Sequence, residues 1–180
     1  MPKWGMVIDT TRCIGCHGCR LACQNQNDLP PKEYFNRIDE KEFGIFPDFK
    51  RRFTAIQCQH CDNPPCVKVC PTGASYKRSD GLVMINNDDC IGCKYCIVAC
   101  PYDARIINEK DGFAQKCGFC IKFVESGEQP ACVTNCPMGV RIFGDLNDPL
   151  SEIVKVITSK KPVRLGEGLG TLPNIYYLLS

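Results

Sequence analysis

The spacing of its cysteines constrains this chain more than any other feature. In residues 90–101, three cysteines follow one another at two-residue gaps, a fourth comes after three more residues, and a proline follows. This spacing is typical of ligands for cubane iron–sulfur clusters, where the first three thiolates bind one cluster and the fourth reaches a second. One such run therefore implies a partner run elsewhere in the chain.

Four such runs are present, and together they use every cysteine. The first and third share one spacing and an Ile-Gly pair, so they form an internal repeat. We expect the glycine of this pair to let the backbone approach a cluster. The second and fourth runs have longer gaps before their third cysteine. In order, the runs comprise Cys13, Cys16, Cys19 and Cys23; Cys58, Cys61, Cys66 and Cys70; Cys90, Cys93, Cys96 and Cys100; and Cys117, Cys120, Cys132 and Cys136.

Disulfides and zinc are the competing interpretations of these cysteines. Disulfides leave unexplained why every run except the first ends in Cys-Pro. Structural zinc favours paired Cys-x-x-Cys knuckles, which the three-plus-one grouping fits poorly. His17 and His60 lie inside runs, but with sixteen thiols available we expect them to form hydrogen bonds or lie at the surface.

Overall charge gives no support to nucleic-acid binding, and the motifs give none to catalysis. The formal charge of +2 becomes about −6 once sixteen thiolates and four cluster cores are counted. We expect Lys94, Lys116 and Lys122 to be solvated charges that offset the clusters and could raise their potentials.

Without its cysteines the apolar fraction of the chain is thin, so we expect clusters to replace part of the core and the apo chain to be largely unfolded. The sequence shows no nucleophile–base pair, phosphate loop or flavin fingerprint, so we expect no catalytic residue.

Short regular elements are expected around the runs. A strand is predicted over residues 6–9, and hairpins with turns at Asp80-Gly81 and Asp111-Gly112 follow the second and third runs. A short helix and loop are expected over residues 121–131. Residues 24–57 lack cysteine and carry aromatic and charged residues. They form either a β-rich loop over the cluster core or a docking surface for a larger subunit.

The C-terminal part is predicted to contain a helix and an apolar tail. Asp148 before Pro149 suits an N-cap, and a helix over Pro149–Thr158 would bury Leu150, Ile153, Val154 and Ile157. The end of the chain, residues 172–180, either packs on its own domain or clasps a partner. Only a short apolar stretch opens the chain, and no run approaches the length of a membrane span. We therefore expect no direct membrane span.

The order and spacing of the four runs resemble a known family. Together with Cys61-Asp-Asn-Pro-Pro-Cys66, Cys100-Pro-Tyr-Asp-Ala-Arg105 and Phe143-Gly-Asp-Leu146, they resemble the iron–sulfur subunits of the polysulfide, thiosulfate and dimethyl sulfoxide reductase group of molybdopterin enzymes. The resemblance covers nearly the whole chain. It implies an α+β fold of tandem bacterial-ferredoxin-like βαβ modules with short hairpins, an inserted β-rich loop and a C-terminal helix and tail.

The resemblance also implies nested pairing of the runs, although spacing alone allows other pairings. Residues 1–23 with 101–147 would form one two-cluster module and residues 58–100 a second, with residues 24–57 as an insertion and 148–180 as a C-terminal helix and docking tail. Because every ligand position is cysteine, four [4Fe-4S] clusters are expected. The implied ligand sets are Cys13, Cys16, Cys19 and Cys136; Cys117, Cys120, Cys132 and Cys23; Cys58, Cys61, Cys66 and Cys100; and Cys90, Cys93, Cys96 and Cys70.

The function implied is that of an electron-transfer subunit in anaerobic respiration. Its partners would be a molybdenum or tungsten bis-pterin catalytic subunit and an integral, quinone-reactive membrane anchor. The chain would be membrane-associated through them, at the periplasmic face with export on a partner's signal, or at the cytoplasmic face. Two alternatives stay open: a free soluble polyferredoxin, and the electron-transfer subunit of a formate dehydrogenase or hydrogenase complex.

Overall fold

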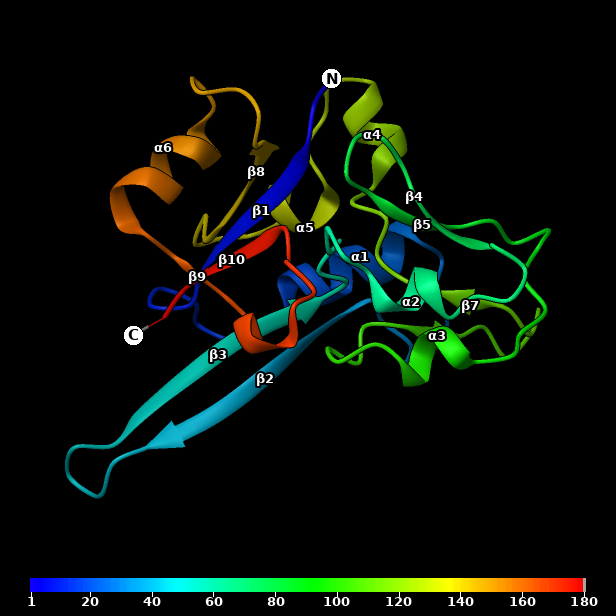
Figure 1. Cartoon of the computed structure of the whole chain (residues 1–180). Coiled ribbons are helices and arrows are strands. Elements are labelled where there is room, and N and C mark those ends of the chain that lie inside the picture. The colour runs from blue at the N-terminus through cyan, green and yellow to red at the C-terminus, as the bar shows by residue number, and fades with distance from the viewer. Residues whose placement is uncertain (180) are drawn as a thin grey trace.

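The computed structural model describes residues 1–179, and its largest sheet joins the two ends of the chain. Four strands lie in the order β8–β1–β10–β9, with β1 antiparallel to β8 and parallel to β10 (Figure 1). The strands are β1 (Trp4–Asp9), β8 (Arg141–Asp145), β9 (Val163–Arg164) and β10 (Ile175–Leu178). The predicted strand over residues 6–9 is confirmed.

The interior strands are apolar because both of their faces are covered. Met6, Val7 and Ile8 of β1 form a continuous buried run, as expected for a strand without a solvent face. Helix α6 (Glu152–Lys160) packs against β1 and β8. Phe119 packs edge-on to Phe143 of β8, with ring centroids 5.1 Å apart. The sheet therefore connects α6 to the core that contains the cysteines.

Helix α6 begins later than predicted. Its N-cap is Ser151, whose Oγ accepts a hydrogen bond from the Val154 amide. The Asp148 carboxylate instead accepts from the Leu150 amide and stabilises a turn before the helix. Leu150 therefore lies outside the helix and is 77% exposed, so its predicted burial is wrong. Ile153 is fully buried, as predicted.

The C-terminal tail packs on its own domain. Residues 175–178 form β10 between β1 and β9, and Tyr177 is fully buried. The Tyr177 hydroxyl donates to the Ala55 carbonyl at 3.1 Å and accepts from Gln59 at 3.0 Å. The tail thus ties the insertion to the sheet, and a docking role of residues 148–180 stays a prediction. Ser180 lies outside the described residues.

Short helices and hairpins surround the cysteine runs. Helix α1 packs against α5, and α2 packs against α3. Both predicted hairpins are confirmed, as is a short helix within residues 121–131. Their strand pairs are antiparallel, so the mixed architecture fits the α+β class, but the βαβ detail is not confirmed. The elements are α1 (Gly18–Gln26), α2 (Pro65–Lys68), β4 (Ser75–Lys77), β5 (Val83–Ile85), α3 (Tyr95–Val98), β6 (Ile106–Ile107), β7 (Ala114–Gln115), α4 (Ile121–Glu125), α5 (Ala131–Thr134) and the 3₁₀ helix η1 (Glu167–Leu169).

The insertion forms one long hairpin that extends away from the rest of the molecule (Figure 1). Strands β2 (Asn36–Phe43) and β3 (Lys50–Gln57) pair along their full length. The base of the hairpin is buried, including Asn36 and Gln57, whereas Phe46 near its tip is 89% exposed. The base therefore covers the core, and the tip is free to contact another molecule. Within residues 1–179 no helix combines the length and apolar character of a membrane span.

Candidate iron–sulfur cluster sites

The structure brings the sixteen cysteines together in four sets, each of which combines cysteines from two runs. Three sets line one cavity each, and the thiols of the other lie close enough to interact electrostatically. All sixteen are free, so the disulfide interpretation is wrong. We call them set A (Cys13, Cys16, Cys19, Cys136), set B (Cys23, Cys117, Cys120, Cys132), set C (Cys58, Cys61, Cys66, Cys100) and set D (Cys70, Cys90, Cys93, Cys96).

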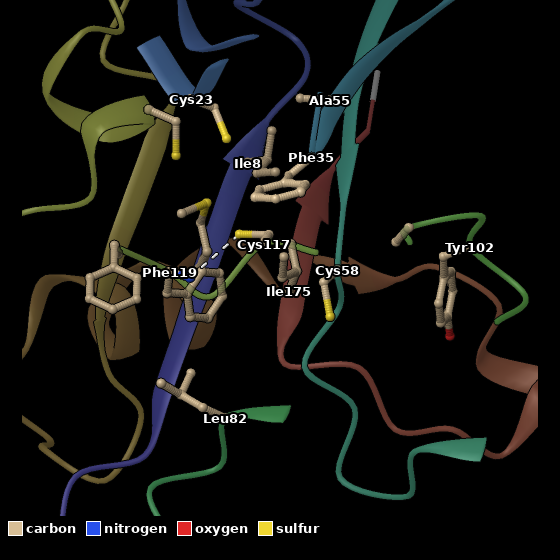
Figure 2. Packing of buried hydrophobic residues seen from close by; sticks show 14 of the residues in the cluster. Ile8, Cys23, Phe35, Ala55, Cys58, Leu82, Tyr102, Cys117, Phe119 and Ile175 are labelled. Carbon is tan, nitrogen blue, oxygen red and sulfur yellow. Dashed lines mark hydrogen bonds between the residues drawn. The ribbon is translucent and has the colours of Figure 1, made fainter. Parts of the chain in front are cut away.

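The four sets lie in the order A, B, C, D. Cys19 of set A interacts electrostatically with Cys132 of set B. Cys117 of set B interacts with Cys58 of set C, and both belong to the core cluster shown in Figure 2. Cys66 of set C and Cys96 of set D both face the Arg105 side chain. The sets are therefore arranged as a series, and the nested combination of runs follows from the packing of α1 on α5 and α2 on α3.

Burial distinguishes the inner sets, B and C, from the outer sets, A and D. Three cysteines in each inner set are buried, whereas each outer set has one exposed cysteine, Cys16 or Cys93. Burial raises the pKa of Cys23 and of Cys61 to about 12, because a buried thiolate loses its hydration. Without bound metal these groups are neutral thiols. A cationic core that deprotonates them fits this donor chemistry.

The backbone around the cysteines is also shaped for an anionic group. Gly15 and His17 both have positive φ angles, and so do Gly92 and Lys94 at the equivalent places of the repeat. Such alternation aims successive N–H groups at one point, an arrangement found in phosphate and iron–sulfur sites. The Ser75 amide, for example, donates to Cys70 Sγ at 3.3 Å. The sites therefore fit four-thiolate clusters in backbone as well as in side chains.

The structure gives a further reason for the glycines of the repeat. A Cβ atom on Gly15 would overlap the Phe53 ring, and one on Gly92 would overlap the Gly112 carbonyl oxygen. Both residues also have φ angles that L side chains rarely adopt. These glycines are thus required by their own backbone angles and by protein neighbours, which the sequence analysis did not predict.

Two buried arginines beside the cysteines were missed by the sequence analysis. Arg105 is 4% exposed, and its Nη2 donates to Cys66 Sγ at 3.0 Å and to the Ser75 hydroxyl at 2.8 Å. Arg141 is 3% exposed, and its Nη1 lies 3.6 Å from Cys132 Sγ. Each follows the last cysteine of its run in the pattern Cys-Pro-x-x-x-Arg, so the sequence did contain a signal.

The histidines and lysines divide between core and surface. His60 is fully buried, accepts a hydrogen bond from the Val83 amide at 3.1 Å and stacks on Phe119, so its predicted hydrogen-bonding role is confirmed. Burial keeps the pKa of His60 well below its usual range. Lys116 is buried and donates to the Cys117 carbonyl at 2.8 Å, so its predicted solvation is wrong. His17, together with Lys94 and Lys122, is exposed, as expected.

Comparison with known proteins gives matches to 4Fe-4S domain models and to components of reductases. Two models, each described as a 4Fe-4S dicluster domain, match residues 49–146 and 12–74. A polysulfide reductase component of Wolinella succinogenes is 44% identical, over 97% of this chain and 93% of that protein. A selenate reductase subunit of Mesobacillus selenatarsenatis is 41% identical, and a tetrathionate reductase subunit of Salmonella typhimurium is 40% identical. Each of these two alignments covers 98% of this chain and 72% of the relative.

Proposed function

Because this protein is a member of the 4Fe-4S dicluster family that includes iron–sulfur subunits of polysulfide, tetrathionate and selenate reductases, we propose that it carries four [4Fe-4S] clusters and relays electrons within such a complex. It is a non-catalytic electron-transfer subunit. The proposed relay runs between a molybdopterin catalytic subunit and a quinone-reactive membrane anchor. Sets A to D would each hold one cluster, which when bound exchanges single electrons.

The serial order of the four cysteine sets is the observation that carries this proposal. Neighbouring sets share an arginine contact or a core cluster, so successive sites lie close together, as a tunnelling relay requires. The buried inner sets exclude water, and the exposed Cys16 and Cys93 bring the two ends to the surface. We assign residues 1–23 with 101–147 to a module that holds sets A and B, and residues 58–100 to a module that holds sets C and D.

Exposed apolar side chains at both ends of the series support partner docking. Ile91, Tyr95 and Val98 are exposed beside set D, and Ile14 is exposed beside set A. Contiguous exposed apolar residues are typical of interaction sites. The tip of the β2–β3 hairpin adds exposed Ile45 and Phe46. We propose that these surfaces contact the partner subunits. The membrane association follows from those partners, and the periplasmic face, with export on a partner's signal, rests on the resemblance alone.

Anaerobic purification of the native complex tests the proposal. We expect about sixteen iron atoms and sixteen sulfides per chain, together with a molybdopterin subunit and a membrane anchor. The reduced clusters should be reoxidised within one turnover by polysulfide, tetrathionate or another acceptor of the catalytic subunit. A Cys93→Ser variant should lose one cluster's worth of iron.

Each alternative predicts a different outcome of the same purification. A fully loaded monomer that exchanges electrons with several enzymes would favour the free polyferredoxin. A copurifying subunit that oxidises formate or hydrogen would favour a dehydrogenase or hydrogenase complex. Clearly fewer than four clusters per fully folded chain would contradict the proposed relay.

A further inference from the structure

One buried arginine lies between the two cysteine sets of each half of the series. The guanidinium of Arg141 contacts Cys132 of set B, and Arg141 also lines the cavity of the set A cysteines. The guanidinium of Arg105 contacts Cys66 of set C, and Arg105 also lines the cavity of the set D cysteines. Both arginines occupy the same place in a Cys-Pro-x-x-x-Arg pattern. The two halves thus repeat one arrangement, in which a cation is placed between neighbouring thiol sets.

Neither arginine has a carboxylate partner within residues 1–179. The ion pairs found there involve other cations, such as Lys3 with Asp62. Arg141 is held by neutral groups, since Nη1 donates to Gln57 Oε1 at 2.7 Å and Nη2 donates to Asn36 Oδ1 at 2.9 Å. A buried charge without a counter-charge is strongly unfavourable. The counter-charge must therefore come from the thiolates on either side.

Arg105 also has hydrogen-bonding capacity that the protein does not use. Its Nη2 binds Cys66 and Ser75, but no described residue accepts a hydrogen bond from its buried Nη1. A buried donor without an acceptor is costly unless some other group approaches it. Sulfur atoms at the neighbouring sets are the acceptors that this position offers.

We propose that Arg141 raises the reduction potentials of the clusters in sets A and B, and that Arg105 does the same for sets C and D. This inference rests on the proposed function, because it requires clusters in the four sets. Net charge and hydrogen bonds to sulfur set cluster potentials, and a cation in a buried site acts with little solvent screening. Both arginines are positioning residues, since they act through the cluster ligands.

The proposed effect applies to an electron transfer that moves no proton. One electron leaves a reduced cluster and enters its oxidised neighbour, and no bond forms or breaks. Because guanidinium stays protonated at all relevant pH values, it offsets the added negative charge without releasing a proton. A cation shared by two neighbours also reduces the repulsion when both are reduced. The potentials of the four clusters should accordingly be independent of pH near neutrality.

Arg105→Gln and Arg141→Gln in the anaerobically purified complex test the proposal. Redox titration followed by electron paramagnetic resonance should give four midpoint potentials for the parent protein. Arg105→Gln should weaken the electron affinity of the clusters in sets C and D by tenfold or more. A tenfold change corresponds to a midpoint potential lower by about 59 mV for a one-electron couple. Arg141→Gln should lower the midpoint potentials of the clusters in sets A and B. Lys122→Gln is the control, because it removes an exposed cation near set B. Solvent and salt screen that charge, so the electron affinities of all four clusters should stay within threefold of the parent values.

Iron and sulfide analysis of every sample separates the possible failures. If the parent complex has no clusters, the proposed function fails. If the glutamine variants keep four clusters with unchanged potentials, or all four shift equally, only the arginine proposal is overturned. If a glutamine variant loses iron, the matching Arg→Lys variant decides. If the lysine variant keeps its clusters and their electron affinities stay within threefold of the parent values, a need for positive charge is supported. If the lysine variant also loses iron, the arginine has a structural role and the proposal is overturned.

Discussion

The inner and outer cysteine sets use the same ligands but differ in their surroundings. The outer sets, A and D, take three cysteines each from the first and third runs, which have only two-residue gaps. The inner sets, B and C, take three each from the runs with longer gaps. In the fourth run the longer gap contains α4, and the inner cysteines pack with Phe119, Ile8 and Ile175 (Figure 2). Extra chain between ligands therefore accompanies burial of the site.

The inner and outer sites should therefore have different roles. Inner cysteines are part of the hydrophobic core, so their ligation should stabilise the whole fold. Outer cysteines, apart from the buried Cys96, are exposed or only partly buried, so their ligation should matter mainly for exchange with partners.

Removal of iron should unfold the protein in two steps. We expect a chelator to take iron first from the outer sets, where Cys16 and Cys93 are exposed, and later from the inner sets. Loss of the inner clusters should abolish near-ultraviolet circular dichroism, because structural metal binding of about 10–16 kcal/mol rivals the whole stability of a domain. Parallel iron assays and spectra measure the order. An apo chain with a native spectrum, or inner loss first, would contradict the distinction.

Single serine substitutions should separate the two kinds of site. Cys117→Ser in set B should lower the stability of the folded chain by about 3 kcal/mol or more, because it disrupts a buried site. Cys93→Ser in set D should remove one cluster but change the stability of the remainder by only about 1 kcal/mol. Thermal melts with iron analysis under argon measure both effects. Equal destabilisation by the two substitutions would remove the basis for the comparison.

Glycine substitutions test the outer site without touching a ligand. Gly92→Ala should cost about 2–3 kcal/mol, since Gly92 has positive φ and a Cβ would meet the Gly112 carbonyl. Gly73→Ala is the matched control, because Gly73 also has positive φ but nothing lies within 4 Å of the added Cβ. We expect the control to cost about 1 kcal/mol. Denaturant unfolding gives both values, and iron release from set D should be faster only in Gly92→Ala.

The smallest effect on stability is expected at the hairpin tip. Phe46 is almost fully exposed, so Phe46→Ser should change the stability of the chain by less than about 0.5 kcal/mol. Its association with a partner subunit should nevertheless weaken by about 1–2 kcal/mol, because exposed aromatics often anchor interfaces. Leu150→Ser, at an exposed residue before α6, is the control. Equal partner affinity in both variants would remove the hairpin tip from the proposed interface.

Local patterns predicted the short elements better than their ends. The Asp-Gly turn at 80–81 and the strands around it follow from local chemistry, and they are found. At α6 the sequence analysis placed the N-cap at Asp148, whereas the structure uses Ser151, three positions later. The choice depends on the Ser151 hydroxyl, which also donates to the Asp145 carbonyl at 2.8 Å. That contact to β8 exists only in the folded chain.

The buried cations show the same limit at the candidate site. The Cys-Pro-x-x-x-Arg pattern occurs twice and is visible in the sequence. The pattern marks Arg105 and Arg141 but does not show that they are buried, whereas Arg12 is exposed. Their burial depends on partners such as Ser75, Asn36 and Gln57, which come from other segments. The burial of Lys116 was missed for the same reason: it depends on the assembled core and not on the local sequence.

The amino-acid sequence is sufficient to predict the iron–sulfur chemistry, because ligand type and spacing are local properties. Sixteen thiols in four runs predict iron–sulfur clusters, and the repeat identifies equivalent backbone positions. Tertiary structure alone decided which sets are buried, in what order they lie and which cations face them. Burial and electrostatics depend on segments far apart in the chain, such as β1 and β10, whose pairing brings the two ends together over the inner cysteines.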